Sequence, residues 1–314
     1  MIYIGIDVGG TGIKAGAVDE QGNILFKHSR PSGVERGYEA MIKDMAELGI
    51  SAVQQSGHSM EEVKAIGIGL PGVLDPRTGR VPFCTNLGWH DVPVIEEMKK
   101  YTGVPVFVDN DATVAGLAEF VAGVSKGCEN SVFVTLGTGV GGGVVIGGKV
   151  FSGSHGVASE IGHMVTVDGG EMCTCGNRGC WERYASATAL IREGRRLCAR
   201  KPDCALMKAV AGDPARITAK DVMDLAKEDD TDCVELFNWY VHHLCVGISN
   251  LINLYDPEVV VLGGGVSYAG PFLRDAVRAR LGQYVFYKDM PYCRVELATL
   301  TNDAGIIGAA MLGR

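Results

Sequence analysis

The sequence has no long hydrophobic run and no excess of positive charge. No apolar stretch approaches the roughly 20 residues that a membrane-spanning helix needs, and the apolar start Met1–Asp7 is too short and too soon interrupted for a signal peptide. The 37 acidic residues outnumber the 29 basic ones, whereas non-specific binding of nucleic acid depends on neutralising phosphates with lysine and arginine. We therefore expect a cytoplasmic protein that binds neither a membrane nor nucleic acid.

Two common nucleotide-binding fingerprints are also missing. Gly137, Gly139 and Gly142 have the spacing of a dinucleotide-binding turn, but a β-branched segment follows where that turn must open a helix. Residues Gly143–Lys149 have the glycine and lysine spacing of a P-loop, but Val150 stands where serine or threonine would bind magnesium. Any nucleotide site in this chain must therefore be built in another way.

Most of the ten cysteines lack the spacing of a disulfide framework. Three of them, Cys173, Cys175 and Cys180, follow His163 closely, and the four side chains can fill the tetrahedron that Zn²⁺ prefers. No position is left for a catalytic water, so we predict a structural zinc site. A disulfide between two of these cysteines is the alternative, which the tight spacing and the expected reducing compartment disfavour. The other seven are expected to be buried or incidental thiols: Cys84, Cys128, Cys198, Cys204, Cys233, Cys245 and Cys293.

Two glutamates flank the predicted zinc site. Glu160 precedes His163 by three positions and Glu182 follows Cys180 by two, so fixing the metal would also fix two hydrogen-bond acceptors. That arrangement suits a polyol pocket. The alternative is a purely structural zinc site whose neighbouring glutamates bind no ligand.

Glycine is abundant, with 44 residues, and it gathers in turns between segments of strand character. Glycines let backbone N–H groups approach phosphate oxygens. In the first turn a hydroxyl and a lysine could bind phosphate as well, and a carboxylate could reach a hydrated Mg²⁺. An ordinary hairpin turn is the alternative. The candidate nucleotide-binding residues here are Asp7, Gly9, Gly10, Thr11, Gly12 and Lys14.

The same device returns at Gly137, Thr138 and Gly139, between strands expected at 131–136 and 144–146. Two such hairpins suggest a duplicated architecture in which each half offers a phosphate clamp to one nucleotide. A third cluster includes Gly264 and Gly265 and opens a helix, so it is a candidate seat for adenosine. Close packing of glycine is an equally simple explanation of that cluster.

Strands and helices alternate along the chain, which predicts a largely parallel α/β core. A length of 314 residues favours two domains. We expect residues 1–120 with a returning helix at 303–314 in the smaller one, and residues 121–302 with the zinc loop in the larger. Helices are expected at 38–55, 94–101, 114–124, 184–199, 218–227, 234–254, 271–281 and 303–312, and strands at 2–8, 13–18, 65–70, 104–108, 131–136, 144–146 and 258–262.

Three polar residues, Asp109, Asn110 and Asp111, follow the strand expected at 104–108 and precede a helix. Open α/β sheets place their ligands at the carboxyl ends of strands. A helix cap accounts for one of the three, and we therefore favour a functional carboxylate among them.

Five motifs together resemble the ROK family (repressors, open reading frames, kinases). They are Asp7-x-Gly-Gly-Thr-x-x-Lys14, Leu70-Pro-Gly72, Asn110-Asp111-Ala112, Glu160-x-Gly-His163 and Cys173-x-Cys-Gly-x-x-Gly-Cys-x-Glu182, in this order over nearly the full length. Within that family, Asn86–Trp89 and Gly179–Ser186 look most like the corresponding segments of bacterial ATP-dependent glucokinases.

The resemblance implies a two-domain, actin-like ATPase (ribonuclease-H-like) fold with a cleft between the domains. It implies glucose and ATP as substrates, Mg²⁺ with ATP, one structural Zn²⁺ and a homodimer or homotetramer. It also implies a general base at Asp111, which would accept the proton of the sugar's 6-hydroxyl. The residues that it assigns to the sugar are Gly72, Asn86, Asn110, Asp111, Glu160, His163 and Glu182.

Other functions within reach of this sequence are a regulator, an actin-like assembly ATPase and a kinase of another hexose. A regulator of the family would need a DNA-binding domain ahead of the first strand, and here Met1 begins that strand. An assembly ATPase would have no use for the carboxylate-flanked zinc loop. N-acetylglucosamine, N-acetylmannosamine, fructose and allose stay open as substrates, as does polyphosphate as donor.

Overall fold

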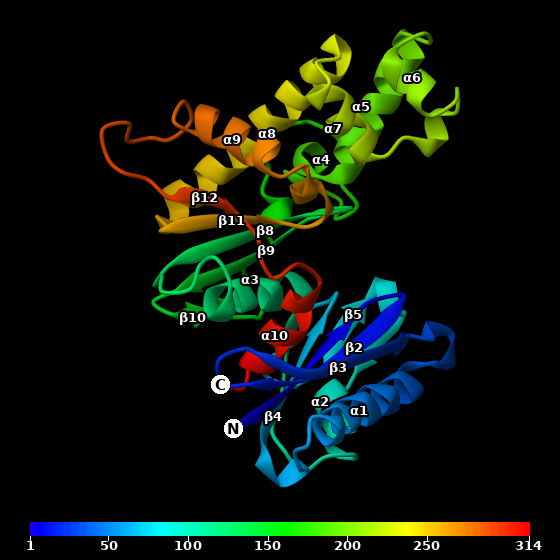
Figure 1. Cartoon of the computed structure of the whole chain (residues 1–314), viewed down its shortest axis with the longest axis vertical. Helices are drawn as coiled ribbons and strands as arrows, with labels where there is room; N and C mark the ends of the chain where they lie inside the picture. The colour runs from blue at the N-terminus through cyan, green and yellow to red at the C-terminus, as the bar shows by residue number, and fades with distance from the viewer. The chain divides into compact units, whose positions relative to one another are not determined.

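The computed structural model describes residues 1–314, which form two compact units (Figure 1). The first unit consists of Met1–Glu129, Gly143–Ser159 and Thr299–Arg314, and the second of Asn130–Gly142 and Glu160–Ala298. The chain thus crosses from one unit to the other four times. None of its helices combines the length and the apolar character that crossing a membrane requires.

The first unit is built on a five-stranded sheet with the order β3-β2-β1-β4-β7. The hairpin strands β1, β2 and β3 are antiparallel, whereas β4 and β7 run parallel to β1. The bounds are β1 Ile2–Val8, β2 Gly12–Asp19, β3 Ile24–Pro31, β4 Val63–Leu70 and β7 Val106–Asn110; a separate hairpin pairs β5 Val81–Cys84 with β6 Trp89–Val92.

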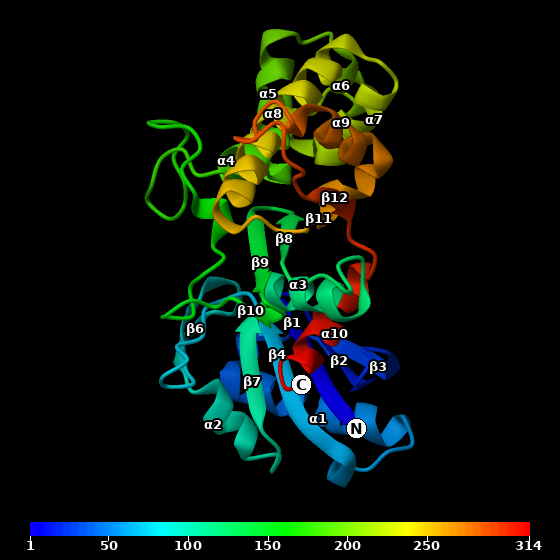
Figure 2. The same ribbon diagram turned by 90° about the vertical axis from the view of Figure 1, so that its left-hand side faces the viewer.

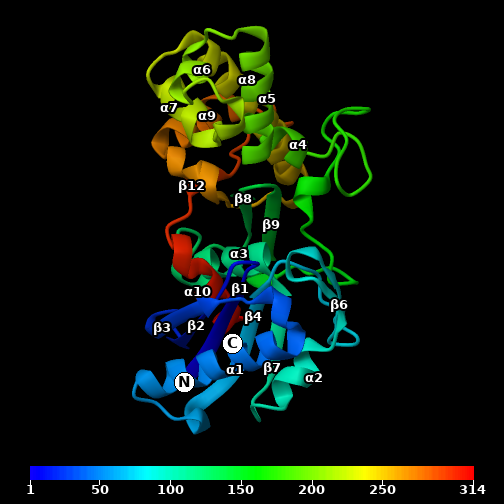
Figure 3. The same cartoon turned by 90° about the vertical axis from the view of Figure 1, so that its right-hand side faces the viewer.

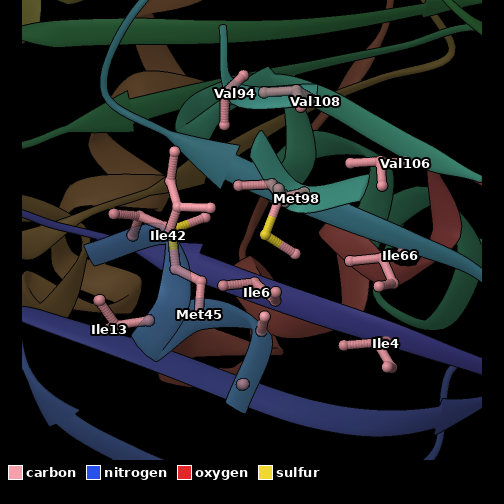
Figure 4. Packing of buried hydrophobic residues seen from close by; sticks show 14 of the residues in the cluster. Ile4, Ile6, Ile13, Ile42, Met45, Ile66, Val94, Met98, Val106 and Val108 are labelled. Carbon is pink, nitrogen blue, oxygen red and sulfur yellow. The ribbon is translucent and has the colours of Figure 1, made fainter. Parts of the chain in front are cut away.

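Helices cover both faces of this sheet. Helices α1 (Tyr38–Gln55) and α2 (Val94–Lys99) lie on one face, and α10 (Ala304–Met311) lies on the other, between the sheet and α3 (Asp111–Ala122) (Figures 1 and 3). The alternation of side chains along a strand decides which core each residue joins. Ile4 and Ile6 of β1 pack toward α1, with Met45, Ile66 and Met98 in the same cluster (Figure 4).

Helix α10 approaches the sheet unusually closely because glycines face it. A Cβ atom at Gly5 of β1 would clash with the carbonyl of Ile306, and one at Gly67 of β4 with the carbonyl of Ala309. On the opposite side of α10, a Cβ at Gly308 would clash with the carbonyl of Val114 in α3. The small residues at these positions therefore let three layers pack backbone to backbone.

Glu119 of α3 is a fully buried carboxylate that holds the segment leading into α10. Its Oε1 accepts hydrogen bonds from the N–H groups of Thr299 at 2.7 Å and Leu300 at 2.8 Å. Its Oε2 accepts from Val124 N at 2.9 Å and from the Thr299 hydroxyl at 3.0 Å. Four donors compensate for the loss of water around this charge.

The second sheet has the order β10-β9-β8-β11-β12, which repeats the hairpin-then-parallel pattern of the first. Strands β8, β11 and β12 are parallel, and β9 and β10 form the hairpin. Helices α8 and α9 lie beside β11 and β12 (Figures 1 and 2). The bounds are β8 Ser131–Leu136, β9 Val140–Ile146, β10 Lys149–Val150, β11 Val259–Gly263, β12 Arg294–Leu297, α4 Glu182–Ala185, α5 Ala187–Arg200, α6 Ala205–Ala209, α7 Ala219–Lys227, α8 Thr231–Tyr255 and α9 Pro271–Leu281.

Most expected elements are present, and the helix expected at 184–199 is interrupted. Ser186 separates α4 from α5 with an extended backbone (φ −97°, ψ 167°), and its hydroxyl accepts from Ala189 N at 3.1 Å. Serine competes with helical hydrogen bonding in this way, which makes it an N-cap. Thr218 caps α7 in a capping box with Asp221, as the sequence predicts.

The two units are divided differently from the expected domain ranges, because residues 121–129, 143–159 and 299–302 all fall in the first unit. The longest of these segments is 143–159. Gly143–Ser159 belongs to the first unit, and the division falls within β9. Gly143 lies against α3, where a Cβ would be 2.8 Å from the Ala112 carbonyl. Gly156 lies against the Leu74 carbonyl. These two contacts could not be predicted from the sequence, because a glycine in a strand or loop does not indicate which segment packs against it.

Candidate active site

The first glycine turn joins β1 to β2 and is closed by its own backbone. Gly9 N–H donates to the Gly12 carbonyl at 2.9 Å, and Thr11 is exposed. Lys14 and Asp7 face each other across the two strands, with Nζ 3.3 Å from Oδ2. An exposed glycine turn, a cation and a carboxylate therefore share one end of the first sheet.

This turn touches two other parts of the first unit. A Cβ atom at Gly305, at the start of α10, would lie 2.5 Å from Asp7 Cγ. A Cβ at Gly10 would lie 3.2 Å from the Asn86 carbonyl. Asn86, a predicted sugar ligand, is thus placed beside the predicted phosphate turn.

Asp109, Asn110 and Asp111 lie where β7 ends and α3 begins. Asn110 is the N-cap of α3, because its Oδ1 accepts from Ala112 N at 2.9 Å, and its Nδ2 donates to the Gly72 carbonyl at 3.3 Å. Asp111 is exposed, and its Oδ1 accepts from the same Ala112 N–H at 2.8 Å. The parallel pairing of β4 with β7 explains this meeting, since it sets Leu70 opposite Asn110.

Asp109 differs from Asp111 in its surroundings. Burial raises the pKa of the Asp109 carboxyl above its usual range, although hydrogen bonds from Asn110 N and the Ser152 hydroxyl oppose the shift. Its oxygens lie 2.7 Å and 3.4 Å from those donors. Asp109 therefore holds local structure, while Asp111 presents its carboxylate to solvent at the helix start.

The second glycine turn joins β8 to β9 and is held by the start of α5. Gly137 N–H donates to the Gly139 carbonyl at 3.0 Å, and the Gly137 carbonyl accepts from Ala187 N at 2.8 Å. The Thr188 hydroxyl donates to the Thr138 carbonyl at 2.7 Å. Each sheet thus carries a closed glycine turn at the end of its first hairpin.

The third glycine cluster follows β11 and packs against the end of β8. Gly264 has φ 79°, and a Cβ there would lie 2.6 Å from Leu136 N, so both its conformation and its packing require glycine. Beside Gly265 lies a cavity of about 240 Å³ between α7 and the 3₁₀ turn Gly265–Ala269. Its lining is mostly apolar and includes three charged residues: Ala219, Lys220, Met223, Asp224, Lys227, Gly265, Val266, Tyr268 and Ala269.

His163, Cys173, Cys175 and Cys180 form one cluster, in the green loop beside α4 in Figure 2. Their ligand atoms all lie within 4.8 Å of one another. Cys173 Sγ is 3.7 Å from His163 Nδ1, and Cys175 Sγ is 3.6 Å from Cys180 Sγ. Sulfurs bound to one zinc ion at about 2.3 Å in a tetrahedron are about 3.8 Å apart. The cluster therefore has the donors and the spacing for a tetrahedral metal ion.

Glu182 connects this cluster with the second glycine turn. One carboxylate oxygen, Oε1, lies 3.0 Å from Cys173 Sγ. The other, Oε2, would lie 2.5 Å from a Cβ added at Gly139. Gly162, next to His163, also touches the turn region, because a Cβ there would clash with the Val140 carbonyl. The cluster of His163 and the three cysteines, the glutamate and the glycine turn are therefore one packed assembly within the second unit.

Comparison with known protein families matches residues 3–314 to the ROK family. The chain belongs to the ROK family. It is 39% identical to the glucokinase of Thermotoga maritima over 98% of this chain and 96% of that protein. Among solved structures it resembles a ROK family glucokinase from Streptomyces griseus in complex with glucose and AMPPNP (34% identity, TM-score 0.81, 99% of both chains). It also resembles the ROK hexokinase of Thermus thermophilus (33% identity, TM-score 0.85, 99% of this chain and 97% of that one).

These matches confirm the expected fold class. The chain has the two-domain, actin-like ATPase fold of ROK sugar kinases, with one mixed sheet at the centre of each half. The predicted duplication is visible in the matching strand orders of the two sheets.

The predicted site residues of this ROK protein form two groups. The first unit contains Asp7, Gly9, Gly10, Thr11, Gly12, Lys14, Gly72, Asn86, Asn110 and Asp111. The second contains Gly137, Thr138, Gly139, Glu160, His163, Cys173, Cys175, Cys180, Glu182, Gly264 and Gly265. Within each group the contacts above join residues that are far apart in the sequence.

Two candidate features were missed by sequence reasoning. Met223 of α7 lines the cavity beside Gly265, whereas the sequence predicted only that residues 218–227 form a helix. Cys84 is buried, within the prediction of a buried or incidental thiol, but its contact was not predicted: its Sγ donates to the Pro71 carbonyl at 2.9 Å, next to Gly72. No sequence signal marks a thiol that holds a turn, because its partner is a backbone carbonyl from another segment.

Proposed function

We propose that this ROK protein is a glucokinase, which transfers the γ-phosphoryl group of ATP to the 6-hydroxyl of glucose. Full-length similarity to glucokinases supports this activity. The observation that carries the proposal is the position of Glu182, which touches both the metal cluster and the second glycine turn. A kinase needs such a connection, because positioning of sugar and phosphate relative to each other supplies most of the catalysis in phosphoryl transfer.

The sugar ligands in this proposal present acceptors and donors that suit a polyol. Asn110 and the Gly72 carbonyl are joined by a hydrogen bond, and Asp111 follows at the helix start. Glu160 and Glu182 add carboxylates on either side of the cluster. The full set is Gly72, Asn86, Asn110, Asp111, Glu160, His163 and Glu182.

Asp111 is the proposed general base. Its exposed carboxylate is anchored by the Ala112 N–H on Oδ1. It would accept the proton of the 6-hydroxyl as that oxygen attacks the γ-phosphorus.

The nucleotide is proposed to bind the three glycine segments. The turns at Gly9–Gly12 and Gly137–Gly139 would hold phosphates with backbone N–H groups, with Lys14 adding a positive charge. Asp7 is the proposed acceptor for the hydration shell of Mg²⁺, which would neutralise charge on the phosphates. The cavity beside Gly265 has a mostly apolar lining with a few charged groups, which suits an adenine ring.

Zinc is the proposed occupant of the cluster of His163 and the three cysteines, where it would hold the loop in place. Four protein ligands leave no open position, so the ion would supply structure rather than catalysis. With Nδ1 of His163 facing the cysteines, the other ring nitrogen is the one available to a sugar hydroxyl. We also propose that the protein self-associates as a homodimer or homotetramer and that it is cytoplasmic.

The test is ADP release by purified protein with Mg-ATP and a panel of hexoses, with the Asp111→Asn variant alongside. We expect glucose to be turned over fastest and kcat to fall by about 10² to 10⁴ in the variant, the usual contribution of a positioned base. Glucose binding by calorimetry should be nearly unchanged. Asp109→Asn is the matched control, because it removes the same charge two residues away. Turnover of another hexose in place of glucose would refute the substrate, and a normal kcat in Asp111→Asn would refute the base.

A further inference from the structure

The loop between α9 and β12 presents an unusual run of exposed apolar side chains. It is the orange loop that projects beside α9 in Figure 1. The residues Phe286–Tyr292 are all exposed, and Phe286 is 81%, Tyr287 62% and Met290 58% accessible. Buried Val285 and Cys293 hold the two ends of this run. We call Phe286, Tyr287, Met290, Pro291 and Tyr292 the aromatic loop surface.

A groove of about 370 Å³ lies on this surface. The end of α8 contributes Ile252 and Asn253, and Asp256 follows that helix as its C-cap. Val285 together with the aromatic loop surface completes the lining. The rings of Phe286 and Tyr287 pack edge to face with centroids 5.8 Å apart. The surface therefore has both projecting rings and a hollow.

Its composition is that of a protein interface. Aromatic residues and methionine are enriched at the centres of interfaces, and contiguous exposed apolar patches on soluble proteins usually mark binding sites. Aromatic side chains can each bury about 150–250 Å². At the exposures found here, the aromatic loop surface offers on the order of 500 Å², more than half of the roughly 800 Å² per partner in a standard interface.

We propose that the aromatic loop surface binds the same surface of a second copy of this chain across a two-fold axis. A two-fold contact uses one patch twice, so the patch must complement itself. Projecting Phe286 rings and the adjacent groove satisfy this requirement in shape. Lys288 and Asp289 satisfy it in charge, because they are adjacent, exposed and opposite in sign.

Net charge argues for a contact at this place. Two copies that each carry a charge of −8 repel each other. The tip of the loop balances Lys288 against Asp289 and is otherwise apolar, so approach there costs little electrostatic free energy. In the two-fold contact, Lys288 of each copy faces Asp289 of the other.

This inference specifies the surface for the self-association proposed above and does not rest on the proposed kinase activity. The first experiment is sedimentation equilibrium of the full chain and of Phe286→Ser. Loss of a central aromatic anchor should weaken self-association by about 30-fold or more. Tyr101→Ser, which changes an exposed tyrosine of the first unit, is the matched control and should keep the wild-type mass. Circular dichroism of all three proteins confirms folding.

A second experiment tests the two-fold arrangement. Lys288→Asp and Asp289→Lys should each weaken self-association, and the double swap should restore it, because the pairing is re-formed with the signs exchanged. A monomeric wild-type protein would overturn self-association itself. A wild-type oligomer that is unaffected by Phe286→Ser would overturn this surface alone. Failure of the double swap to restore the mass would overturn the two-fold contact.

Discussion

At the scale of single residues, Gly139 shows how one missing side chain can join two functions. Its Cα lies against the Glu182 carboxylate, which in turn lies beside Cys173. A methyl group there would occupy space that Glu182 Oε2 fills at 2.5 Å. The residue belongs to the proposed phosphate turn, but its substitution should weaken the binding of the sugar.

Gly139→Ala should therefore raise KM for glucose by about tenfold, equivalent to about 1.4 kcal/mol of lost binding. Gly137→Ala is the matched control, because a Cβ at that position meets no atom within 4 Å. We expect the control to change KM for ATP. KM for glucose should stay within about twofold, because an added methyl group at Gly137 would not displace Glu182. Steady-state kinetics with each substrate varied measures both. Equal effects of the two variants on glucose would show that Glu182 does not transmit the change.

The candidate site was predictable where residue chemistry is local. Glycine turns, the polar run Asp109–Asp111 and the spacing of His163 with three cysteines are visible in the sequence, and the structure brings the last four side chains together. The lining at Met223 was not predictable. The position of Met223 in the cavity depends on the packing of α7 against the segment after Gly265. The apolar periodicity of a helix indicates that one face is buried, but not which segment covers that face.

At the scale of secondary-structure elements, the junction of α3 with α10 is held by Glu119. Glu119→Gln keeps the shape of the side chain but replaces one acceptor oxygen by an NH₂ group facing N–H or O–H donors. Whichever oxygen is replaced, two of the four hydrogen bonds are lost. A buried donor without a partner costs about 1–3 kcal/mol.

We expect Glu119→Gln to lower the free energy of unfolding by about 2–4 kcal/mol, measured by urea denaturation. Glu47→Gln, a change at an exposed glutamate of α1, should lower it by at most about 0.5 kcal/mol. A loss no larger than that of the control would mean that the four contacts of Glu119 do not contribute to stability.

Elements with one regularly buried face were predicted well from the sequence. Strands that exist because they pair with a neighbouring strand were predicted poorly. The helix Tyr38–Gln55 has the predicted bounds because its apolar period is regular. Strand β3 was missed, since its burial alternates between half-buried and exposed residues and it is fixed by pairing with β2. The four-residue strand β12 was also missed, because it depends on β11 as its neighbour.

At the scale of the whole molecule, the proposed zinc should act on stability and sugar affinity together. Removing it with a chelator, followed by restoring Mg²⁺, should raise KM for glucose by about tenfold or more, because ligand orientation would be lost. Calorimetry should show a lower Tm, with the second unit unfolding first. Cys175→Ala should reproduce both effects, whereas Thr174→Ala, at an exposed neighbour in the same loop, should reproduce neither. Unchanged kinetics after removal of the metal would separate the cluster from the sugar site.

The position of α10 has a consequence for synthesis on the ribosome. This helix fills the space against Gly5 and Gly67, yet its residues are translated after all the other helices and strands of the two units. Protein synthesis proceeds at about 5–20 residues per second. The helix that covers one face of β1 is therefore made many seconds after β1 itself. The first unit cannot complete its core before Thr299–Arg314 have been synthesised, so the nascent protein must keep an apolar sheet face protected until then.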